Sequence, residues 1–350
     1  MSSPTGPSFP PAEHLDVQVR GSVPVGLSGR LLGIGRDGIV HSLVIGPGRP
    51  AWYQTQRLGT EASVRNVLEF GGTILAFGDD APAHELSAGL DAFRAVDLAG
   101  HGRLLVPFPK RDPVTDELHL VARARDGAQS HVVVTAGALT RRDRPILDVS
   151  RRITDLALTA DRVVFVAPGI VGIAPREGEA RTRCFATGAP APHPVHAHDA
   201  GDTVVLFVLT PMLERWTLHV GAGTTRREVL DPTPRRFAHA SDGDAGGAPR
   251  WVWTTGDETI RGHDLVAARR THHDLRPWVP GDFVVAADAA RPDGVDGGRL
   301  IALVHGPSDT ATELRVFDAA DVTGPAVATV GIPRPVPPGL RCTWIPSSEH

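Results

Sequence analysis

Short apolar runs with a period of two recur along the whole chain, and this pattern most constrains the fold. Alternation of this kind presents one face of a β-strand to a core. Gly-Gly and Gly-Asp pairs, which are turn signals, precede several of the runs. The clearest runs cover residues 73–77, 131–135, 162–166, 203–207, 250–253 and 299–304. Since no segment shows a helical repeat longer than about two turns, we expect an all-β protein.

The regular recurrence of short strands predicts a sandwich, a barrel or a propeller. Hairpin turns occur throughout the 350 residues, and no linker follows the N-terminal segment, so a propeller is favoured. Its blades have diverged, because the sequence shows no fixed-period repeat. We predict a poorly ordered tail over residues 1–20 and a single domain over residues 21–350.

Composition excludes several classes of partner. The 36 basic residues are balanced by 40 acidic ones, and the absence of a basic run argues against nucleic acid. The longest apolar stretches, such as 204–209, are too short to cross a bilayer, and residues 1–12 lack the features of a signal peptide. Cys184 and Cys342 are too few for a disulfide framework. We therefore expect a cytoplasmic protein without stable membrane insertion, whose oligomeric state the sequence does not indicate.

Six local strings resemble, in the correct order, the carotenoid cleavage oxygenases. They include "PFPKRDPVTDEL" (107–118), "ITDLALTADRVVF" (153–165) and "HPVHAHDAGDTVVL" (193–206). The others lie within residues 21–53, 71–82 and 313–346. Members of this family cleave polyene or stilbene double bonds with ferrous iron. The resemblance spans residues 21–346 and implies a seven-bladed β-propeller with an iron on its axis.

The resemblance also implies four iron-binding histidines, of which three are replaced. Phe108, Thr154 and Arg341 stand at these positions, while the motif residues beside them, such as Lys110 and Asp155, are retained. His193 is the histidine that survives. A single imidazole cannot hold ferrous iron against water, and a guanidinium at the axis would repel the cation. We therefore predict a degenerate metal site with no metal and no cofactor.

The carboxylates that would orient the ligand histidines have changed as well. By resemblance, Asp79 is a shortened glutamate, Arg236 replaces another, and the third has no clear counterpart near Asp282-Phe283. The 39 residues from Thr154 to His193 (193 − 154) leave little room for the helical cap of this family. We expect a more open pocket and weak or no membrane attachment.

A rival metal site is conceivable around His193, His196 and His198, with Asp199 as a carboxylate. The last two histidines share one strand face, and two histidines with a carboxylate can bind zinc or iron. Local packing and hydrogen bonding of these histidines is the favoured interpretation. For Cys342, a buried inert thiol is favoured over one activated by Arg341.

Two classes of function remain open. The first is a metal-independent, non-oxidative enzyme of secondary metabolism, an isomerase, cyclase or lyase acting on an apolar polyene- or polyketide-like molecule. His193 would act as acid or base and Arg341 would stabilise negative charge, both from an axial pocket. Further contacts with the substrate are predicted for Phe108, Thr154, Asp79, His196, His198 and Arg236. By periodicity, Asp155 would face away from Thr154, which makes it a poor partner for Arg341. The alternative is a non-catalytic, ligand-binding pseudoenzyme, and a third possibility is an iron-dependent oxygenase with substitute ligands.

Overall fold

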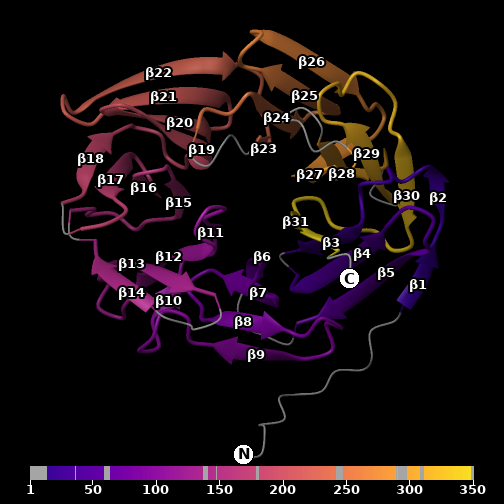
Figure 1. Cartoon of the computed structure of the whole chain (residues 1–350), viewed down its shortest axis with the longest axis horizontal. Coiled ribbons are helices and arrows are strands. Elements are labelled where there is room, and N and C mark those ends of the chain that lie inside the picture. The colour runs from indigo at the N-terminus through magenta and orange to yellow at the C-terminus, as the bar shows by residue number, and fades with distance from the viewer. Residues whose placement is uncertain are drawn as a thin grey trace, which may run out of the picture. The chain divides into compact units, whose positions relative to one another are not determined.

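The regular structure of this chain consists of strands. The computed structural model describes residues 14–35, 37–58, 64–136, 141–146, 148–178, 181–241, 247–288, 290, 298–307 and 311–347. Within these ranges the elements form seven antiparallel sheets and no α-helix is present (Figure 1). Seven sheets of four or five strands each are the blades of a seven-bladed β-propeller, so the all-β and propeller predictions are confirmed.

The first three sheets come mainly from the N-terminal part of the chain. One has the order β1 (His14–Val17), β5 (Ala51–Arg57), β4 (Ile39–Ile45), β3 (Gly29–Ile34) and β31 (Arg341–Pro346). The next consists of β6 (Val64–Phe70), β7 (Thr73–Gly78), β8 (Ala83–Leu86) and β9 (Phe93–Val96). The third consists of β10 (Leu104–Leu105), β12 (Glu117–Arg123), β13 (Gln129–Thr135) and β14 (Arg141–Pro145), with β11 (Lys110–Arg111) also paired to β12.

The other four sheets follow in chain order. The first of them has the order β15 (Asp155–Leu158), β16 (Arg162–Ala167), β17 (Ile170–Pro175) and β18 (Arg183–Ala186). The second has the order β19 (His193–Ala200), β20 (Thr203–Leu209), β21 (Leu213–His219) and β22 (Thr224–Asp231). Next come β23 (Phe237–Ala240), β24 (Trp251–Gly256), β25 (Thr259–Asp264) and β26 (Arg269–Asp274). The last has the order β2 (Val19–Gly21), β30 (Ala328–Ile332), β29 (Thr312–Asp318), β28 (Arg299–His305) and β27 (Val279–Ala286).

The N-terminal boundary needs a correction. Residues 14–20, which the sequence assigned to a poorly ordered tail, form β1 and most of β2. Leu15 of β1 pairs with Tyr53 of β5, and Val19 of β2 pairs with Val330 of β30. These short segments carry too few residues to show a period, so their pairing with distant strands was not visible in the sequence. Residues 1–13 lie outside the described residues.

The chain divides into two compact units, each built from separate stretches of sequence. Unit 1 contains residues 1–76, 84–95 and 251–350, and unit 2 contains residues 77–83 and 96–250. In unit 1 the C-terminal strand β31 lies beside β3, with Arg341 opposite Ile34 (Figure 1). A single domain over 21–350 stays a prediction.

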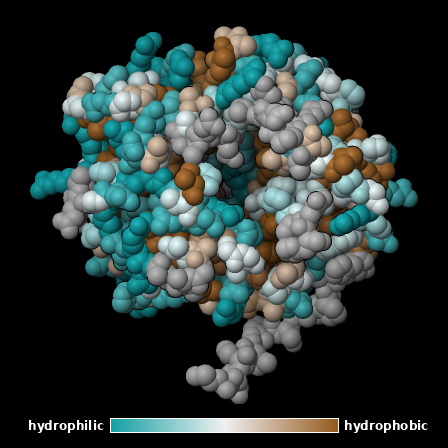
Figure 2. Space-filling view, viewed as in Figure 1, coloured by the Kyte–Doolittle hydropathy of each residue, from teal (hydrophilic) through white to brown (hydrophobic). Residues whose placement is uncertain are grey.

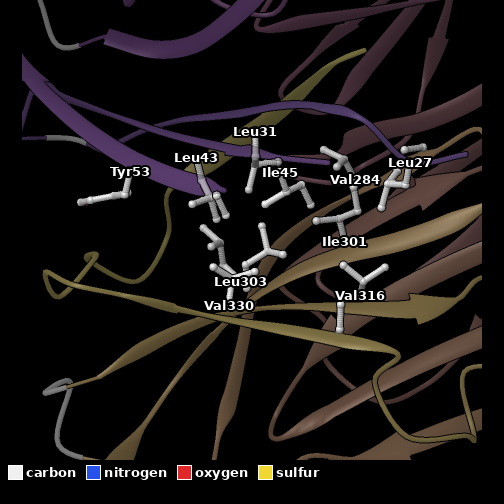
Figure 3. Close-up of a cluster of buried hydrophobic side chains, with 14 of the residues drawn as sticks. Leu27, Leu31, Leu43, Ile45, Tyr53, Val284, Ile301, Leu303, Val316 and Val330 are labelled. Carbon is white, nitrogen blue, oxygen red and sulfur yellow. The ribbon is translucent and has the colours of Figure 1, made fainter. Parts of the chain in front are cut away.

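The core of unit 1 lies between two of its sheets. Side chains of β3, β4 and β5 face those of β28, β29 and β30 (Figure 3). Leu43, Tyr53 and Val330 are each at most 3% exposed. Burying a side chain of this size stabilises the fold by roughly 1.5–3 kcal/mol, so these paired apolar faces hold the two sheets together.

The surface is predominantly polar. The face drawn in Figure 2 is mostly hydrophilic, with apolar residues scattered over it. Among the described residues, the large apolar side chains that are exposed are the isolated valines Val25, Val114, Val229, Val266 and Val327. Scattered apolar side chains are normal on a protein surface. No helix in the described part of the chain is long and apolar enough to span a membrane.

Candidate active site

Three inner strands of unit 2 bring together a lysine, an aspartate and a histidine. Lys110 begins β11, Asp155 begins β15 and His193 begins β19, and β15 lies next to both of the other strands (Figure 1). The Nδ1 atom of His193 lies 2.8 Å from Oδ2 of Asp155. The Nζ atom of Lys110 lies 3.6 Å from the other oxygen, Oδ1. One carboxylate therefore holds an imidazole on one side and an ammonium on the other.

Asp155 is buried, with only 3% of its side chain exposed. Burial alone would raise the pKa of this carboxyl, but the charges of Lys110 and His193, with hydrogen bonds from His193 and the Leu156 N–H, lower it below its usual value. Opposite charges and donors favour the ionised form in this way. Asp155 is therefore an ionised carboxylate at neutral pH, able to orient the His193 ring.

Phe108, which by the resemblance replaces a ligand histidine, packs against His193. Its ring meets the His193 ring edge to face, with 5.6 Å between the centroids and 71° between the planes. Edge-to-face pairs of this kind are favourable. Both side chains are half-buried. Phe108 thus provides an apolar wall for the imidazole.

Thr154 differs from the role predicted for it. It precedes β15, is exposed, and donates its hydroxyl to the carbonyl of Val166 at 3.2 Å. Its backbone N–H donates to the same carbonyl at 2.8 Å. Of the two neighbours Thr154 and Asp155, it is Asp155 that is buried and lies beside His193. The two residues alternate in burial as predicted, but the sequence did not indicate that Asp155 is a partner of His193.

These residues do not fit a ferrous ion. A phenyl ring offers no donor, and the Thr154 hydroxyl is engaged with a backbone carbonyl. By the resemblance the fourth ligand position is Arg341, and its guanidinium is positively charged like the metal ion, so it would repel the ion. In the part of the chain that the structure describes, no group of three His, Cys, Asp or Glu side chains could hold a metal ion. The donor set supports one imidazole ligand, which is too few for iron.

The predicted rival cluster is divided among separate contacts. His196 makes a hydrogen bond through Nε2 to the carbonyl of Gly247 at 2.9 Å. His198 stacks on Phe207 with centroids 6.1 Å apart, and burial, together with the nearby His196, lowers its pKa. Asp199 pairs with Arg162. These contacts agree with the packing interpretation of the two histidines.

Two predicted contact residues of unit 2 lie on its surface. Asp79 lies in the turn after β7 and is exposed. Arg236 is exposed as well, whereas its neighbour Arg235 is fully buried and pairs with Asp231, with Nε 3.1 Å from Oδ2. One of the two adjacent arginines is therefore buried, but it is Arg235 and not the predicted Arg236, and it already has a carboxylate partner.

Arg341 belongs to unit 1 and is described there. It begins β31 and is half-buried, next to Cys342, whose backbone N–H donates to Oδ2 of Asp282 at 2.9 Å. Burial raises the pKa of the Cys342 thiol well above its ordinary value, and Asp282 adds to this while Arg341 opposes it. The thiol is thus a poor nucleophile, as the inert interpretation holds. A joint role for Arg341 and His193 stays a prediction.

Unit 2 also contains a cavity of about 740 Å³. Lys110 lines it, as do the segments that follow Asp155 and His193 on their strands, at 157–161 and 194–197. The lining combines charged side chains with apolar ones such as Leu158 and Val195. This volume is in the range of small-molecule sites. The sequence predicted an apolar axial pocket, so the abundance of charge here is a new feature.

A buried histidine pair beside this cavity was not found from the sequence. Nδ1 of His119 lies 3.0 Å from Nε2 of His131, and Arg176 reaches both His119 and Asp112. Burial lowers the pKa of His119 to about 4 and that of His131 to about 3. Both rings are therefore neutral at physiological pH. Their period-two position on strands was the only available signal, and it does not distinguish them from other core residues.

Comparison with known proteins shows which family this chain is similar to. The sequence profile of the family described as "Retinal pigment epithelial membrane protein" (RPE65) matches residues 191–346. A carotenoid cleavage oxygenase of Mycobacterium tuberculosis is 23% identical, over 95% of this chain and 94% of that protein. The apocarotenoid-15,15'-oxygenase of Synechocystis is 26% identical over 38% of this chain.

Solved structures show the same fold. A variant of the Synechocystis apocarotenoid oxygenase superposes with a TM-score of 0.84, at 16% identity and over 97% of both chains. The chain is therefore similar, at 16–26% identity, to proteins of the carotenoid cleavage oxygenase and RPE65 family, and it shares their fold. Because the resemblance puts Phe108, Thr154 and Arg341 where this family has ligand histidines, the similarity does not by itself assign the family's reaction to this chain.

Proposed function

We propose that this protein is a metal-independent, non-oxidative enzyme, of isomerase, cyclase or lyase type, acting on an apolar polyene- or polyketide-like molecule. The observation that carries the proposal is the Asp155–His193 pair, in which a buried, ionised carboxylate orients the one histidine retained. An imidazole oriented by a carboxylate is a general base that acts near neutral pH.

The arrangement supports proton transfer in particular. Because Nδ1 of His193 lies 2.8 Å from the Asp155 carboxylate, the neutral tautomer with its proton on Nδ1 is favoured, and that tautomer carries its lone pair on Nε2. It could take a proton from an activated carbon of the ligand at Nε2 and return it to another carbon, which moves a double bond without an oxidant. Asp155 would stabilise the imidazolium formed in between. The Phe108 ring on His193 limits water around the base.

The experiment uses the purified protein, a chelator and strict exclusion of oxygen. A panel of polyenes and apocarotenoids is incubated with the protein. The products are separated by chromatography, and their molecular masses are measured by mass spectrometry. We expect products of unchanged mass, or products that have lost a small neutral molecule. His193→Ala should lower the rate by about 10²–10⁴-fold, whereas the surface change Arg236→Ala should not.

Other results would favour the alternatives. Tight binding with quantitative recovery of the ligand favours the non-catalytic pseudoenzyme. Cleavage products that appear only when oxygen and ferrous salt are supplied favour an iron-dependent oxygenase with substitute ligands. Activity that persists unchanged in His193→Ala contradicts the assignment of the base.

A further inference from the structure

The cavity of unit 2 has four cationic side chains in its lining, and three of them are occupied. Arg111 pairs with Asp116, Arg142 with Glu117, and Arg176 with Asp112. Each of these pairs joins a guanidinium to a carboxylate by a direct hydrogen bond. Their charges are therefore matched by neighbouring carboxylates.

Lys110 is different. Its Nζ atom is 3.6 Å from Oδ1 of Asp155, which is too long for a hydrogen bond, and 34% of its side chain is exposed. The same carboxylate accepts from the Leu156 N–H through Oδ1, and its Oδ2 lies 2.8 Å from Nδ1 of His193. An ammonium has three protons to donate. Lys110 thus makes no short contact with Asp155, and it lines the cavity.

Lys110 is also the sole lysine in a chain with 36 basic residues. Every other basic position carries arginine, whose planar fork matches carboxylates in two-point contacts. A compact ammonium at this one cavity-lining position differs in shape and in donor geometry from all the others. Lysine at position 110 is therefore a distinct recognition element within the cavity.

Beyond the ion pairs, the lining combines apolar residues with two threonines and the acidic residues Asp161 and Glu177, and its apolar part is suited to an apolar body. Leu158, Val195, Ala197 and the proline rings at 113, 175 and 194 contribute to the wall. A small molecule that is apolar along most of its length and carries an anion at one end would match both parts. We propose that this cavity binds an apolar molecule with a terminal carboxylate, and that the Lys110 ammonium holds the carboxylate.

This inference deepens the proposed function, because it names the head group of the ligand and rests on that function for the apolar body. It adds a coupling between the two sides of Asp155. A carboxylate on Lys110 shares the ammonium with Asp155, which leaves the Asp155 charge more fully available to His193. The binding step is nevertheless independent of turnover and can be measured alone.

The probes are parinaric acid, a fluorescent polyene carboxylate, and its methyl ester, which has the same body without the charge. Titration of the full chain should show that the acid binds at least about tenfold more tightly than the ester, because only the acid offers a charged acceptor to the Lys110 ammonium. In Lys110→Met this preference should fall to about twofold or less. Lys110→Arg, which keeps the charge, should retain part of it.

Arg111→Met is the matched control. It removes the same charge from the adjacent residue of the same cavity, and Arg111 is half-exposed and already paired with Asp116. We expect it to change the preference by less than about threefold, as for other exposed ion pairs. Equal affinities of acid and ester for the wild type would overturn the proposal. An equal loss of preference in Arg111→Met would also overturn it, because the summed positive charge of the cavity, rather than a contact with Lys110, would then explain the preference for the acid.

A second measurement avoids substitution altogether. Reductive ¹³C-methylation labels only Lys110 and the terminal amine, so the lysine gives one dimethylamine signal. That signal should shift on addition of the acid and stay in place with the ester; an unchanged signal contradicts the proposal. If the acid binds as expected but is recovered unchanged, the proposed reaction fails while the carboxylate site stands.

Discussion

Replacing Asp155 by asparagine tests the central contact of the candidate site. Asparagine is nearly isosteric and keeps an acceptor for the Leu156 N–H, but it loses the charge that faces His193 and Lys110. Hydrogen bonds to charged groups contribute roughly 1.5–3 kcal/mol. Because about a third of the Lys110 side chain is exposed, its ammonium can be solvated in the variant, which reduces the loss of stability. We expect Asp155→Asn to lower the free energy of unfolding by about 2 kcal/mol at pH 6.

The effect should depend on pH with a definite sign. The pKa of Asp155 in the folded protein is below its ordinary value of 3.8, so its stabilising contribution is present above that value. It is lost as the pH falls through the folded-state pKa. The gap in stability between wild type and Asp155→Asn should therefore be full at pH 6 and shrink progressively below pH 3.8.

Urea unfolding followed by tryptophan fluorescence measures this gap from the shift in midpoint at equal slope. Asp116→Asn is the control, because Asp116 pairs with Arg111 but half of its side chain is exposed; its cost should stay within about 1 kcal/mol. Equal midpoints for wild type and Asp155→Asn at pH 6 would refute the reasoning. A gap that persists unchanged below pH 3 would refute it as well.

Three further predictions follow from the same structure. Elemental analysis after expression with ferrous salt should give well under one iron per chain, and stoichiometric iron that survives a chelator wash would contradict the ligand assignment. Arg341→Ala should impair ligand binding or turnover without unfolding the protein, with partial rescue by Arg341→Lys because the planar fork is lost; wild-type handling of the ligand by the alanine variant would contradict this. Trp216→Ala should cost about 3–5 kcal/mol, since Trp216 is fully buried and donates to Glu214 at 2.8 Å; a urea midpoint no lower than that of Val229→Ala, an exposed-site control, would contradict it.

The strands were predictable because their signal is local. Runs such as 162–166 and 203–207 lie within β16 and β20, and the Gly201-Asp202 turn before β20 has Gly201 at a φ of 64°. A positive φ of this kind is easily adopted by glycine. The number of blades came from the resemblance, since diverged blades leave no repeat to count. The pairing of residues 14–20 with strands far along the chain had no local signal at all.

The candidate site was predictable only in part, for the same reason. Sequence identified His193 and Phe108, and the structure brings their rings together. It did not identify Asp155 or Lys110 as partners, because that contact joins the first residues of β11, β15 and β19 in three different sheets. Both residues were noted as retained beside a lost histidine. Retention next to a lost ligand is thus the one sequence signal that could have pointed to them.

The Asp155–His193 contact also suggests how a metal ligand can become a base. A histidine that binds a metal through Nε2 commonly donates its Nδ1–H to a carboxylate, which fixes the tautomer and the ring orientation. The 2.8 Å contact between Nδ1 of His193 and Asp155 has this form. The Nε2 lone pair that it presents suits a metal ion or a proton equally well. With a phenyl ring and a threonine at two of the other positions, an iron would lack ligands, whereas a proton needs only one. On the proposed function, loss of the other histidines would remove the metal-binding role of His193 and leave intact what proton transfer requires.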